Sequence, residues 1–404
     1  MAWQNWSGSV TAEPQQIVSP SSESELSEIV RRAVKDEQTI RVVGTGHSFV
    51  PLCATDGLLL SLDNLQGVVA LDESRGVGTI WAGSKLHQLG EPLLEAGLAL
   101  ENMGDIDRQS LAGAIGTGTH GTGPTLGNMS TQVVGLHIIT ATGDIIEIST
   151  TNDPERIHAA RVSLGALGIV SRVTLRLLPA YRLHERTWVE PFDKCFARRD
   201  ELIAATRHFE FFWSPRDDAC ACKALHPTEK ESHELEGKRE AVPGRLERYV
   251  QEARIDFSHR IFPSERNRLF NEMEFAIPEA AGPACMQDIR RLMLERFPDV
   301  TWPVEYRTLG GDETWLSPAY QRDAVTISIH QAADLPYNEF FAAAEEVFRA
   351  YEGRPHWGKL HAQSPAELAA LYPRWEAFQK VCQALDPQGC FLNDYLREIF
   401  AVNP

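Results

Sequence analysis

Two glycine-rich loops in the first third of the chain restrict what this sequence can fold into. The first loop follows a short β-branched strand predicted for Ile40–Val43, and it reads Val43-Gly44-Thr45-Gly46-His47-Ser48. The second runs from Ser110 to Gly123 and contains Gly113, Thr117, Gly118, Thr119 and His120. Glycine allows consecutive backbone N–H groups to converge on an anion, and the interleaved hydroxyls add donors.

Neither loop is the dinucleotide-binding fingerprint of Rossmann folds, because Gly44 and Gly46 have no third glycine at the required offset. The spacing alone leaves two interpretations open. The loops could hold the pyrophosphate and ribityl chain of a dinucleotide, or they could be two ordinary turns.

Size and composition indicate a globular protein of two domains. The chain has 404 residues, of which 43% are hydrophobic and 24% charged. A net charge of −17 argues against a nucleic acid or an anionic membrane as partner. The N-terminus lacks a secretory signal, and no apolar window is long enough to span a bilayer. Seven scattered cysteines are not a disulfide framework, so we expect a reducing, cytoplasmic location.

Mixed short elements predict an α+β fold. In the first part, we expect helices over 22–36 and 85–96, the latter closed by Gly97, and strands over 57–62, 77–82 and 133–139. After residue 182 an aromatic strand, 209–213, alternates with a neighbour at 219–225. We further expect amphipathic helices over 286–297 and 337–351, a strand over 324–330, and an exposed excursion over 229–248.

The first loop, with Pro51-Leu52 and Thr55-Asp56-Gly57, resembles the flavin-attachment segment of the aldonolactone oxidoreductases. This family of vanillyl-alcohol-oxidase-type FAD proteins includes L-gulonolactone, D-arabinonolactone and alditol oxidases. The segments 102–123 and 165–170 resemble the second and third FAD segments of the family. The resemblance extends over nearly the whole chain, through 209–215, 272–278, 305–307, 354–359 and 391–396.

The resemblance implies an FAD-binding α+β domain over residues 1–178. It implies a substrate domain over 179–404, with an antiparallel sheet and flanking helices, whose C-terminal segment returns to the first domain. It also implies FAD bound covalently through His47; the alternative is a histidine that only hydrogen-bonds its own loop. The implied cofactor-binding residues are Val43, Gly44, Thr45, Gly46, His47, Ser48, Gly104, Ser110, Gly113, Thr117, Gly118, Thr119, His120, Ile169 and His356.

Four residues are implied at the substrate site: Asp105, Glu305, Arg307 and Lys359. Glu305 and Arg307 are two apart in an extended segment, so their side chains share a face and could hold a polyol or lactone. Without the resemblance a surface ion pair would be the simpler interpretation. Lys359 could help to remove the substrate's hydroxyl proton, whereas an isolated lysine is ordinarily solvated. Asp105 could accept a hydrogen bond from the substrate or cap the following turn.

We therefore expect FAD-dependent oxidation of an aldono-1,4-lactone, by hydride transfer to flavin N5 and reoxidation by O₂ or another acceptor. The resemblance places Gly104 beside the reactive face of the flavin, where a glycine would leave space for dioxygen and favour an oxidase. The alternatives are an alditol oxidase acting on xylitol or sorbitol, a non-catalytic flavin protein, and a nucleotide-binding module without redox chemistry. We expect no metal site, because strand alternation explains the Cys220-Ala221-Cys222 spacing. His330 could face the cavity or belong to the core.

Overall fold

The apolar strand segments of the first part form two sheets, of three and five strands. The computed structural model describes residues 2–233, 252–264 and 268–402. One sheet is parallel, in the order β3-β5-β4, and the other is antiparallel, in the order β10-β9-β11-β7-β6. Their strands are β3 Gln16–Val18, β4 Ile40–Val43, β5 Leu58–Ser61, β6 Val68–Asp72, β7 Val77–Trp81, β9 Val133–Ile139, β10 Ile145–Ser149 and β11 Ile169–Arg176. Two short pairs are β1 Trp3–Gln4 with β2 Thr11–Ala12, and β8 Leu98–Ala99 with β12 Leu178–Pro179.

Four helices accompany these sheets. They are α1 Glu23–Lys35, α2 Gly90–Glu95, α3 Leu111–Gly116 and α4 Arg156–Ala160. The side chain of Ser22 caps α1 by accepting a hydrogen bond from the Glu25 N–H, and the apolar stripe of the helix faces the core. α3 begins at Ser110, inside the second glycine loop.

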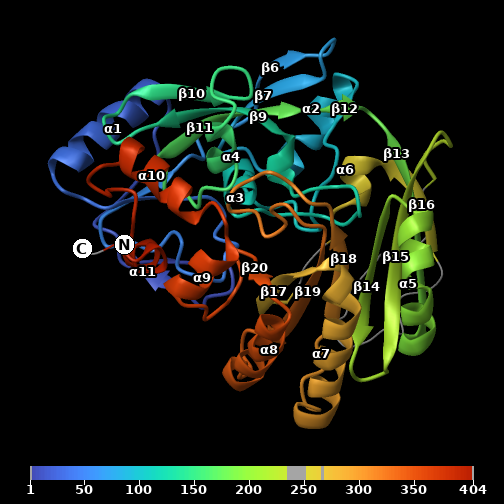
Figure 1. The fold of residues 1–404 in the computed structure, drawn as a ribbon. Helices are drawn as coiled ribbons and strands as arrows, with labels where there is room; N and C mark the ends of the chain where they lie inside the picture. The colour runs from blue at the N-terminus through green and yellow to red at the C-terminus, as the bar shows by residue number, and fades with distance from the viewer. Residues whose placement is uncertain (1, 234–251, 265–267, 403–404) are drawn as a thin grey trace.

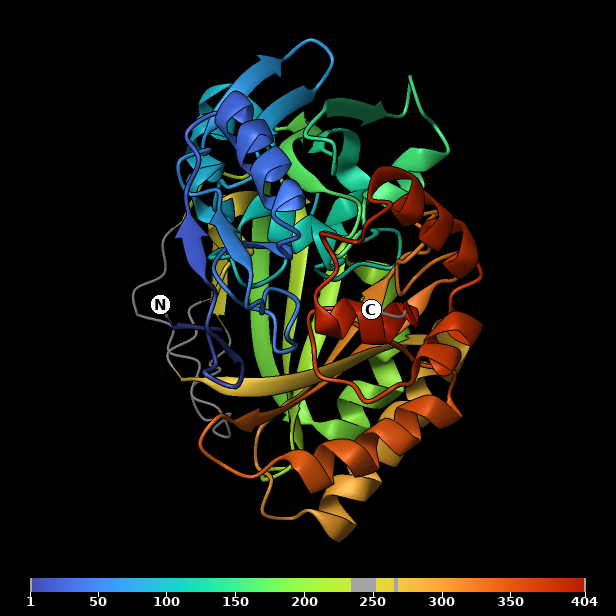
Figure 2. The same cartoon turned by 90° about the vertical axis from the view of Figure 1, so that its left-hand side faces the viewer.

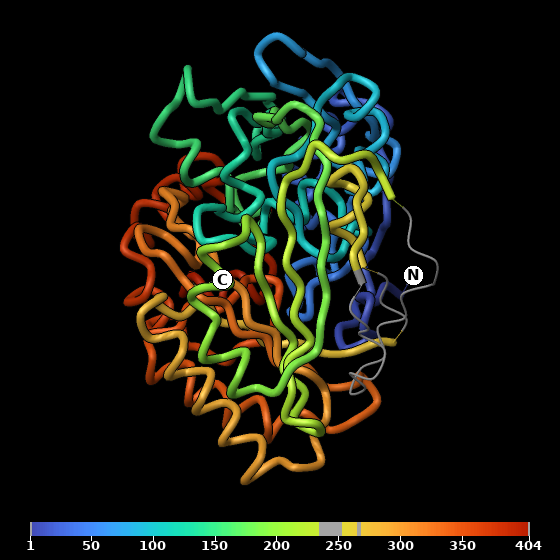
Figure 3. The backbone as a smooth tube through the Cα atoms, turned by 90° about the vertical axis from the view of Figure 1, so that its right-hand side faces the viewer, coloured from blue at the N-terminus to red at the C-terminus, as the bar shows by residue number. Residues whose placement is uncertain are grey.

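The second part is built on one antiparallel sheet of eight strands, in the order β16-β13-β15-β14-β18-β19-β17-β20. Its long strands run along one side of the molecule (Figure 3). The strands are β13 Arg182–Pro191, β14 His208–Ser214, β15 Ala219–Thr228, β16 Glu252–Phe257, β17 Phe270–Pro278, β18 Val304–Leu309, β19 Ala324–Ala332 and β20 Arg354–Pro355.

The two faces of this sheet differ in character because alternate side chains point to opposite sides. One face is apolar, with Phe211, Phe275 and Ile327 in a core beneath three helices (Figure 1). These helices are α5 Phe192–Ala205, α7 Gly282–Arg296 and α8 Asn338–Ala350. The opposite face is polar although most of it is buried. It carries Glu210, Glu272, Glu274, Glu305, Arg307, Ser328 and His330, which are buried, and Lys223, which is half-buried.

The C-terminal segment packs with the first part of the chain, where its red helices lie beside blue segments in Figure 2. Phe378, Phe391 and Leu396 share one apolar core with Leu26 and Leu60. The buried guanidinium of Arg41 on β4 donates to the carbonyl oxygens of Leu52 and Phe391. The remaining helices are α6 Ser258–Ile261, α9 Pro365–Leu371, α10 Trp375–Leu385 and α11 Asp394–Phe400.

Most predicted elements agree with these bounds to within a few residues. The helix predicted over 85–96 is wrong in one respect: it is a 3₁₀ turn at Leu86–Gln88 followed by the short α2. Leu89 lies between the two, and α2 begins at Gly90, whose backbone packs against the ring of His259 so closely that a Cβ would lie 2.3 Å from a ring carbon. Gly97 follows α2 with φ +70°, in the left-handed conformation expected of it.

Most of the excursion predicted over 229–248 lies outside the described residues, and the boundary at 178 stays a prediction. Among the described helices, none combines the length and the apolar character needed to cross a bilayer.

Candidate active site

Two adjoining clefts lie beside the glycine loops. The first, of about 930 Å³, is lined by β4, α3 and residues 163–170. The second, of about 750 Å³, lies between the glycine loops and the polar face of the eight-stranded sheet. Ser48 and Thr117 line both clefts, which together form one elongated space.

The first cleft fits an elongated dinucleotide such as the predicted FAD. Gly44 lies against Ser110 so closely that a Cβ would sit 2.1 Å from the Ser110 Oγ, and the two glycine loops therefore touch. By contrast, a Cβ on Gly116 would meet no protein atom within 4 Å, so this glycine leaves room in the cleft.

The predicted cofactor residues divide between the two clefts. The first is lined by Val43, Gly44, Ser48, Ser110, Gly113, Thr117 and Ile169. The second is lined by His47, Ser48, Gly104, Thr117, Thr119, His120 and His356. Thr45, Gly46 and Gly118 are not among the described residues that line either cleft. Gly46 and Gly118 instead shape their loops, with φ of +68° and +76°.

His47 faces the second cleft beside the N-terminal segment. Its ring lies 5.4 Å from the ring of Trp6, and the Asn5 amide donates to the Ser48 carbonyl at 3.0 Å. Burial, aided by the nearby Lys359, lowers the pKa of His47 to about 4, so its imidazole is neutral at neutral pH. The sequence analysis did not predict that Asn5 and Trp6 of the N-terminal segment lie beside this loop.

Arg307 occupies the centre of the polar face and contacts three carboxylates. Its Nε donates to Glu210 at 2.7 Å, and its Nη2 lies 3.0 Å from Asp105 Oδ2 and 2.5 Å from Glu305 Oε1. Glu305 and Arg307 therefore share a face, as predicted. Asp105 contacts two cations, Arg307 and Lys223. The sequence predicted that Asp105 would accept a hydrogen bond from the substrate or cap a turn, and it did not predict these ion pairs.

Glu305 lies in the second cleft with spare hydrogen-bonding capacity. Its Oε1 is buried and makes no hydrogen bond, since the Arg307 contact is an ion pair without hydrogen-bond geometry. Burial raises the pKa of Glu305 to about 7; Arg307 opposes this, while Glu210 and Asp105 reinforce it.

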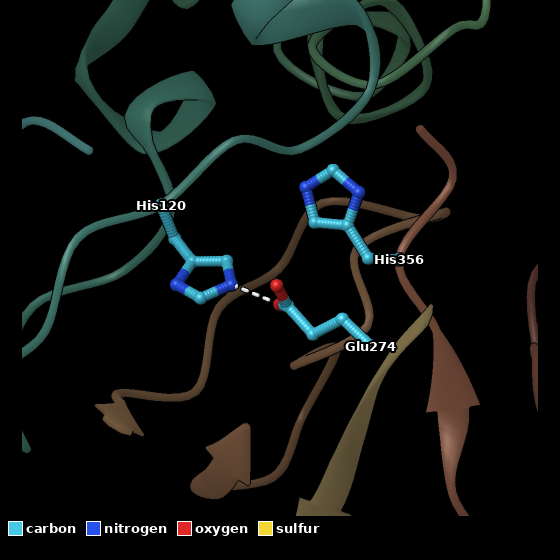
Figure 4. Close-up of side chains that lie close together, drawn as sticks. All are labelled: His120, Glu274 and His356. Atoms are coloured by element: carbon cyan, nitrogen blue, oxygen red, sulfur yellow. Dashed lines mark hydrogen bonds and ion pairs between the residues drawn. The ribbon is translucent and has the colours of Figure 1, made fainter. Parts of the chain in front are cut away.

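A second buried group joins the two parts of the chain. His120 from the second glycine loop, Glu274 on β17 and His356 after β20 point toward one another (Figure 4). His120 Nδ1 faces the Gly121 carbonyl at 2.7 Å and Nε2 faces Glu274 at 2.5 Å. Two acceptors at the two ring nitrogens favour the imidazolium. Burial alone would lower the pKa of His120, but Glu274 outweighs burial and raises it.

His356 has the opposite protonation state. Its Nδ1 accepts a hydrogen bond from the Gly358 N–H at 3.0 Å, which places the ring proton on Nε2. Burial lowers the pKa of His356 to about 4. The two imidazoles in this group are therefore held in different charge states by fixed contacts.

Lys359 and His330 both contact Glu272. The Lys359 ammonium donates to Glu272 Oε2, and His330 Nε2 lies 3.5 Å from Oε1. Burial would raise the pKa of Glu272, but Lys359 and His330 lower it to about 2. His330 lines the cleft, which resolves the alternative left open by the sequence.

The sequence did not identify Glu210, Lys223, Glu272 and Glu274 as site residues. Each is a charged residue at an alternate position of an otherwise apolar strand. A charge embedded in this way marks a buried polar face, and it is the signal that could have found them.

Cys220 and Cys222 lie in the apolar core of the second part, beside Cys195 of α5. The Sγ atoms of Cys195 and Cys222 are 3.4 Å apart. With Glu190 these two cysteines place ligand atoms within 4.8 Å of one another, as does the group of Figure 4. The prediction of no metal stays untested.

Comparisons with known proteins agree with this arrangement. The sequence profile of the D-arabinono-1,4-lactone oxidase family matches residues 173–264 and 241–399, and that of an FAD-binding domain matches 14–149. The L-gulono-1,4-lactone dehydrogenase of Mycobacterium tuberculosis is 36% identical over 98% of both chains. The L-gulonolactone oxidase of Bos taurus and the alditol oxidase of a Streptomyces species are each 30% identical, again over 98% of both chains.

The fold is that of a known structure, a cholesterol oxidase from B. sterolicum. The two superpose with a TM-score of 0.88 at 17% identity, over 99% of this chain and 96% of that one. The predicted fold class, a two-part α+β flavoprotein of the vanillyl-alcohol-oxidase type, is confirmed.

Proposed function

The chain belongs to the D-arabinono-1,4-lactone oxidase family, and from this membership we propose that it oxidises a sugar-derived aldono-1,4-lactone with FAD as cofactor. L-gulono-1,4-lactone is the first substrate to test, because the relative at 36% identity carries that name. The observation that carries the proposal is the row of Glu305, Arg307 and Lys359 along one wall of the second cleft.

These side chains suit a neutral, polyhydroxylated ring. Arg307 and Lys359 offer N–H donors to lactone and hydroxyl oxygens, and Glu305 offers an acceptor. When bound, FAD supplies the acceptor for the hydride that leaves the carbinol carbon. The remaining task for the protein is to remove the hydroxyl proton.

We assign proton acceptance to Glu305 and not to Lys359. The Lys359 ammonium already donates to Glu272 and has no lone pair for a proton, whereas Glu305 Oε1 is a carboxylate oxygen whose contact is the ion pair with Arg307. A pKa of about 7 also suits a general base at neutral pH, because the group is ionised yet still basic. Asp105 and Arg307 hold the substrate and the Glu305 carboxylate in place.

We further propose that FAD is attached covalently to His47. The support is the family resemblance of the loop and a neutral imidazole, which can act as a nucleophile, in the second cleft next to Ser48, which lines both clefts. Acid precipitation of the purified protein tests this. Yellow colour in the pellet and a flavinylated peptide containing His47 are expected; a colourless pellet with free FAD in the supernatant would contradict the link.

Anaerobic reduction tests the substrate. L-gulono-1,4-lactone or D-arabinono-1,4-lactone is expected to bleach the flavin absorbance, and failure of every aldonolactone would contradict the proposal. The second candidate, oxidation of an alditol, is favoured by the 30% identical alditol oxidase. Bleaching by xylitol or sorbitol alone would establish it, and bleaching by no sugar derivative would leave a non-catalytic flavin protein.

We propose O₂ as one electron acceptor, because Gly104 leaves no side chain beside the second cleft. We also propose a cytoplasmic location, supported by seven free cysteines. An oxygen-electrode assay tests the electron acceptor, and cell fractionation tests the location.

A further inference from the structure

Lys223 has two carboxylate partners on the polar face but is not among the described residues that line the second cleft. It borders a smaller pocket together with Asp105 and Glu210. A buried lysine needs compensation for the water it has lost. Its position in the sheet explains how that compensation is provided.

Three neighbouring strands carry a ladder of alternating charge. Lys223 on β15 is the register partner of Glu210 on β14, which is in turn the register partner of Arg307 on β18. Lys223 Nζ lies 3.0 Å from Glu210 Oε1, and Arg307 Nε lies 2.7 Å from Glu210 Oε2. Opposite charges at directly paired positions stabilise neighbouring strands.

Asp105 closes this ladder into a ring. It lies 3.2 Å from Lys223 and 3.0 Å from Arg307, so each of the two carboxylates contacts both cations. The side chains of all four residues are exposed by 12% or less. With two positive and two negative groups, the ring of Lys223, Glu210, Arg307 and Asp105 is neutral.

Glu305 is the additional carboxylate, attached to the ring through Arg307. The charged or titratable groups that face it are Arg307 on its own strand, Glu210 on β14, Asp105 between β8 and α3, His330 on β19 and Glu272 on β17. Lys223 and Arg307 together balance the charges of Asp105 and Glu210. Without Lys223, Arg307 alone would face three carboxylates.

We propose that Lys223 is a positioning residue that keeps Glu305 able to accept the substrate proton at neutral pH. It acts through Asp105 and Glu210, and it contributes no contact to the substrate. The inference rests on the proposed function, because it concerns the base assigned to that reaction. The competing explanation is purely structural: Lys223 only compensates two buried carboxylates.

Charge-changing variants of the holoenzyme separate the two explanations. The pH dependence of anaerobic flavin reduction by L-gulono-1,4-lactone gives the midpoint at which the base ionises. Removing a cation in Lys223→Met raises this midpoint, and removing an anion in Asp105→Asn lowers it. A rise of one pH unit slows reduction about tenfold at pH values below the midpoint. Lys223→Arg keeps the charge and is expected to restore the wild-type midpoint.

Arg290→Met is the matched control, because Arg290 forms an ion pair with Asp218 on the helix-covered side of the same sheet. It is expected to reduce stability without moving the midpoint. An unchanged midpoint in Lys223→Met, or shifts of the same sign in Lys223→Met and Asp105→Asn, would overturn the inference. If Lys223→Met does not fold, Lys223→Gln, which also removes the cation but keeps a polar side chain beside Asp105 and Glu210, decides by the same criterion.

A readout without substrate keeps this test separate from the test of the proposed function. The absorbance of the oxidised flavin is titrated with pH, and Glu305→Gln identifies the ionisation that belongs to Glu305. This midpoint is expected to move as it does in the kinetic assay, even if no aldonolactone reduces the flavin. If Glu305→Gln removes no ionisation from the titration, the inference is wrong whatever the substrate is.

Discussion

The imidazole of His120 lies 2.5 Å from the carboxylate of Glu274, and both side chains are almost completely buried. This contact joins the second glycine loop to strand β17, so it holds one wall of the second cleft against the other. Ser328 donates to the second oxygen of the same carboxylate at 2.9 Å. The contact therefore stabilises the structure of the cleft and also contributes to its electrostatics.

Glu274→Ala should destabilise the protein strongly, because it leaves a buried imidazolium without its counter-ion. Removing one partner of a buried pair costs about 3–5 kcal/mol. Thermal and denaturant unfolding of the holoenzyme measure the loss. Glu274→Gln keeps an acceptor for His120 and should lose less. Glu91→Ala breaks an exposed pair with His259 and serves as control, with little expected loss. Equal stability of all three variants would contradict a structural role for the buried pair.

Gly44→Ala and Gly116→Ala should both lose flavin, but only Gly44→Ala should also lose stability. At Gly44 the added methyl would overlap the Ser110 side chain, so we expect lower stability of the apoprotein as well as lost flavin. At Gly116 the methyl meets no protein atom and enters the first cleft. The apoprotein should then be as stable as wild type, or more stable by about 0.5–1 kcal/mol, while its flavin content falls. A normal flavin content in Gly116→Ala would place the cofactor elsewhere.

Flavin reduction should rise with pH through a midpoint near 7. Burial raises the pKa of Glu305 to about 7, so the carboxyl is protonated, and unable to accept a proton, below that pH. Anaerobic stopped-flow measurement of the reduction rate gives the profile. Glu305→Gln should abolish this limb and slow reduction by about 10²–10⁴-fold. A limb that persists in Glu305→Gln would assign it to another group.

Gly104→Ala should slow reoxidation by O₂ more than it slows reduction. A Cβ at this position would lie 3.0 Å from the His120 carbonyl and 3.3 Å from a Thr119 methyl, so it fits only with small adjustments. Reduced enzyme mixed with oxygenated buffer gives the oxidative rate, and an artificial dye gives the control. Equal slowing with O₂ and dye would indicate a general distortion of the cleft.

The glycine loops and the Glu305–Arg307 pair could be predicted because their signals are local. A strand that runs into a glycine loop at Gly44 can be recognised from residues that are neighbours in the sequence, and so can two charges that are two residues apart. The partners of those charges could not be predicted in this way. Glu210 and Lys223 come from two other strands, and Asp105 comes from the opposite wall, more than one hundred residues earlier than Lys223.

The sequence by itself determined the family, the flavin loops, the strand periods and the presence of Glu305, Arg307 and Lys359. Tertiary structure alone decided the raised pKa of Glu305. A carboxylate's proton affinity depends on burial and on charges within a few ångströms, and strand register sets those distances. His47 shows both contributions: its loop is visible in the sequence, whereas its neutral imidazole follows from burial beside Trp6 and Lys359.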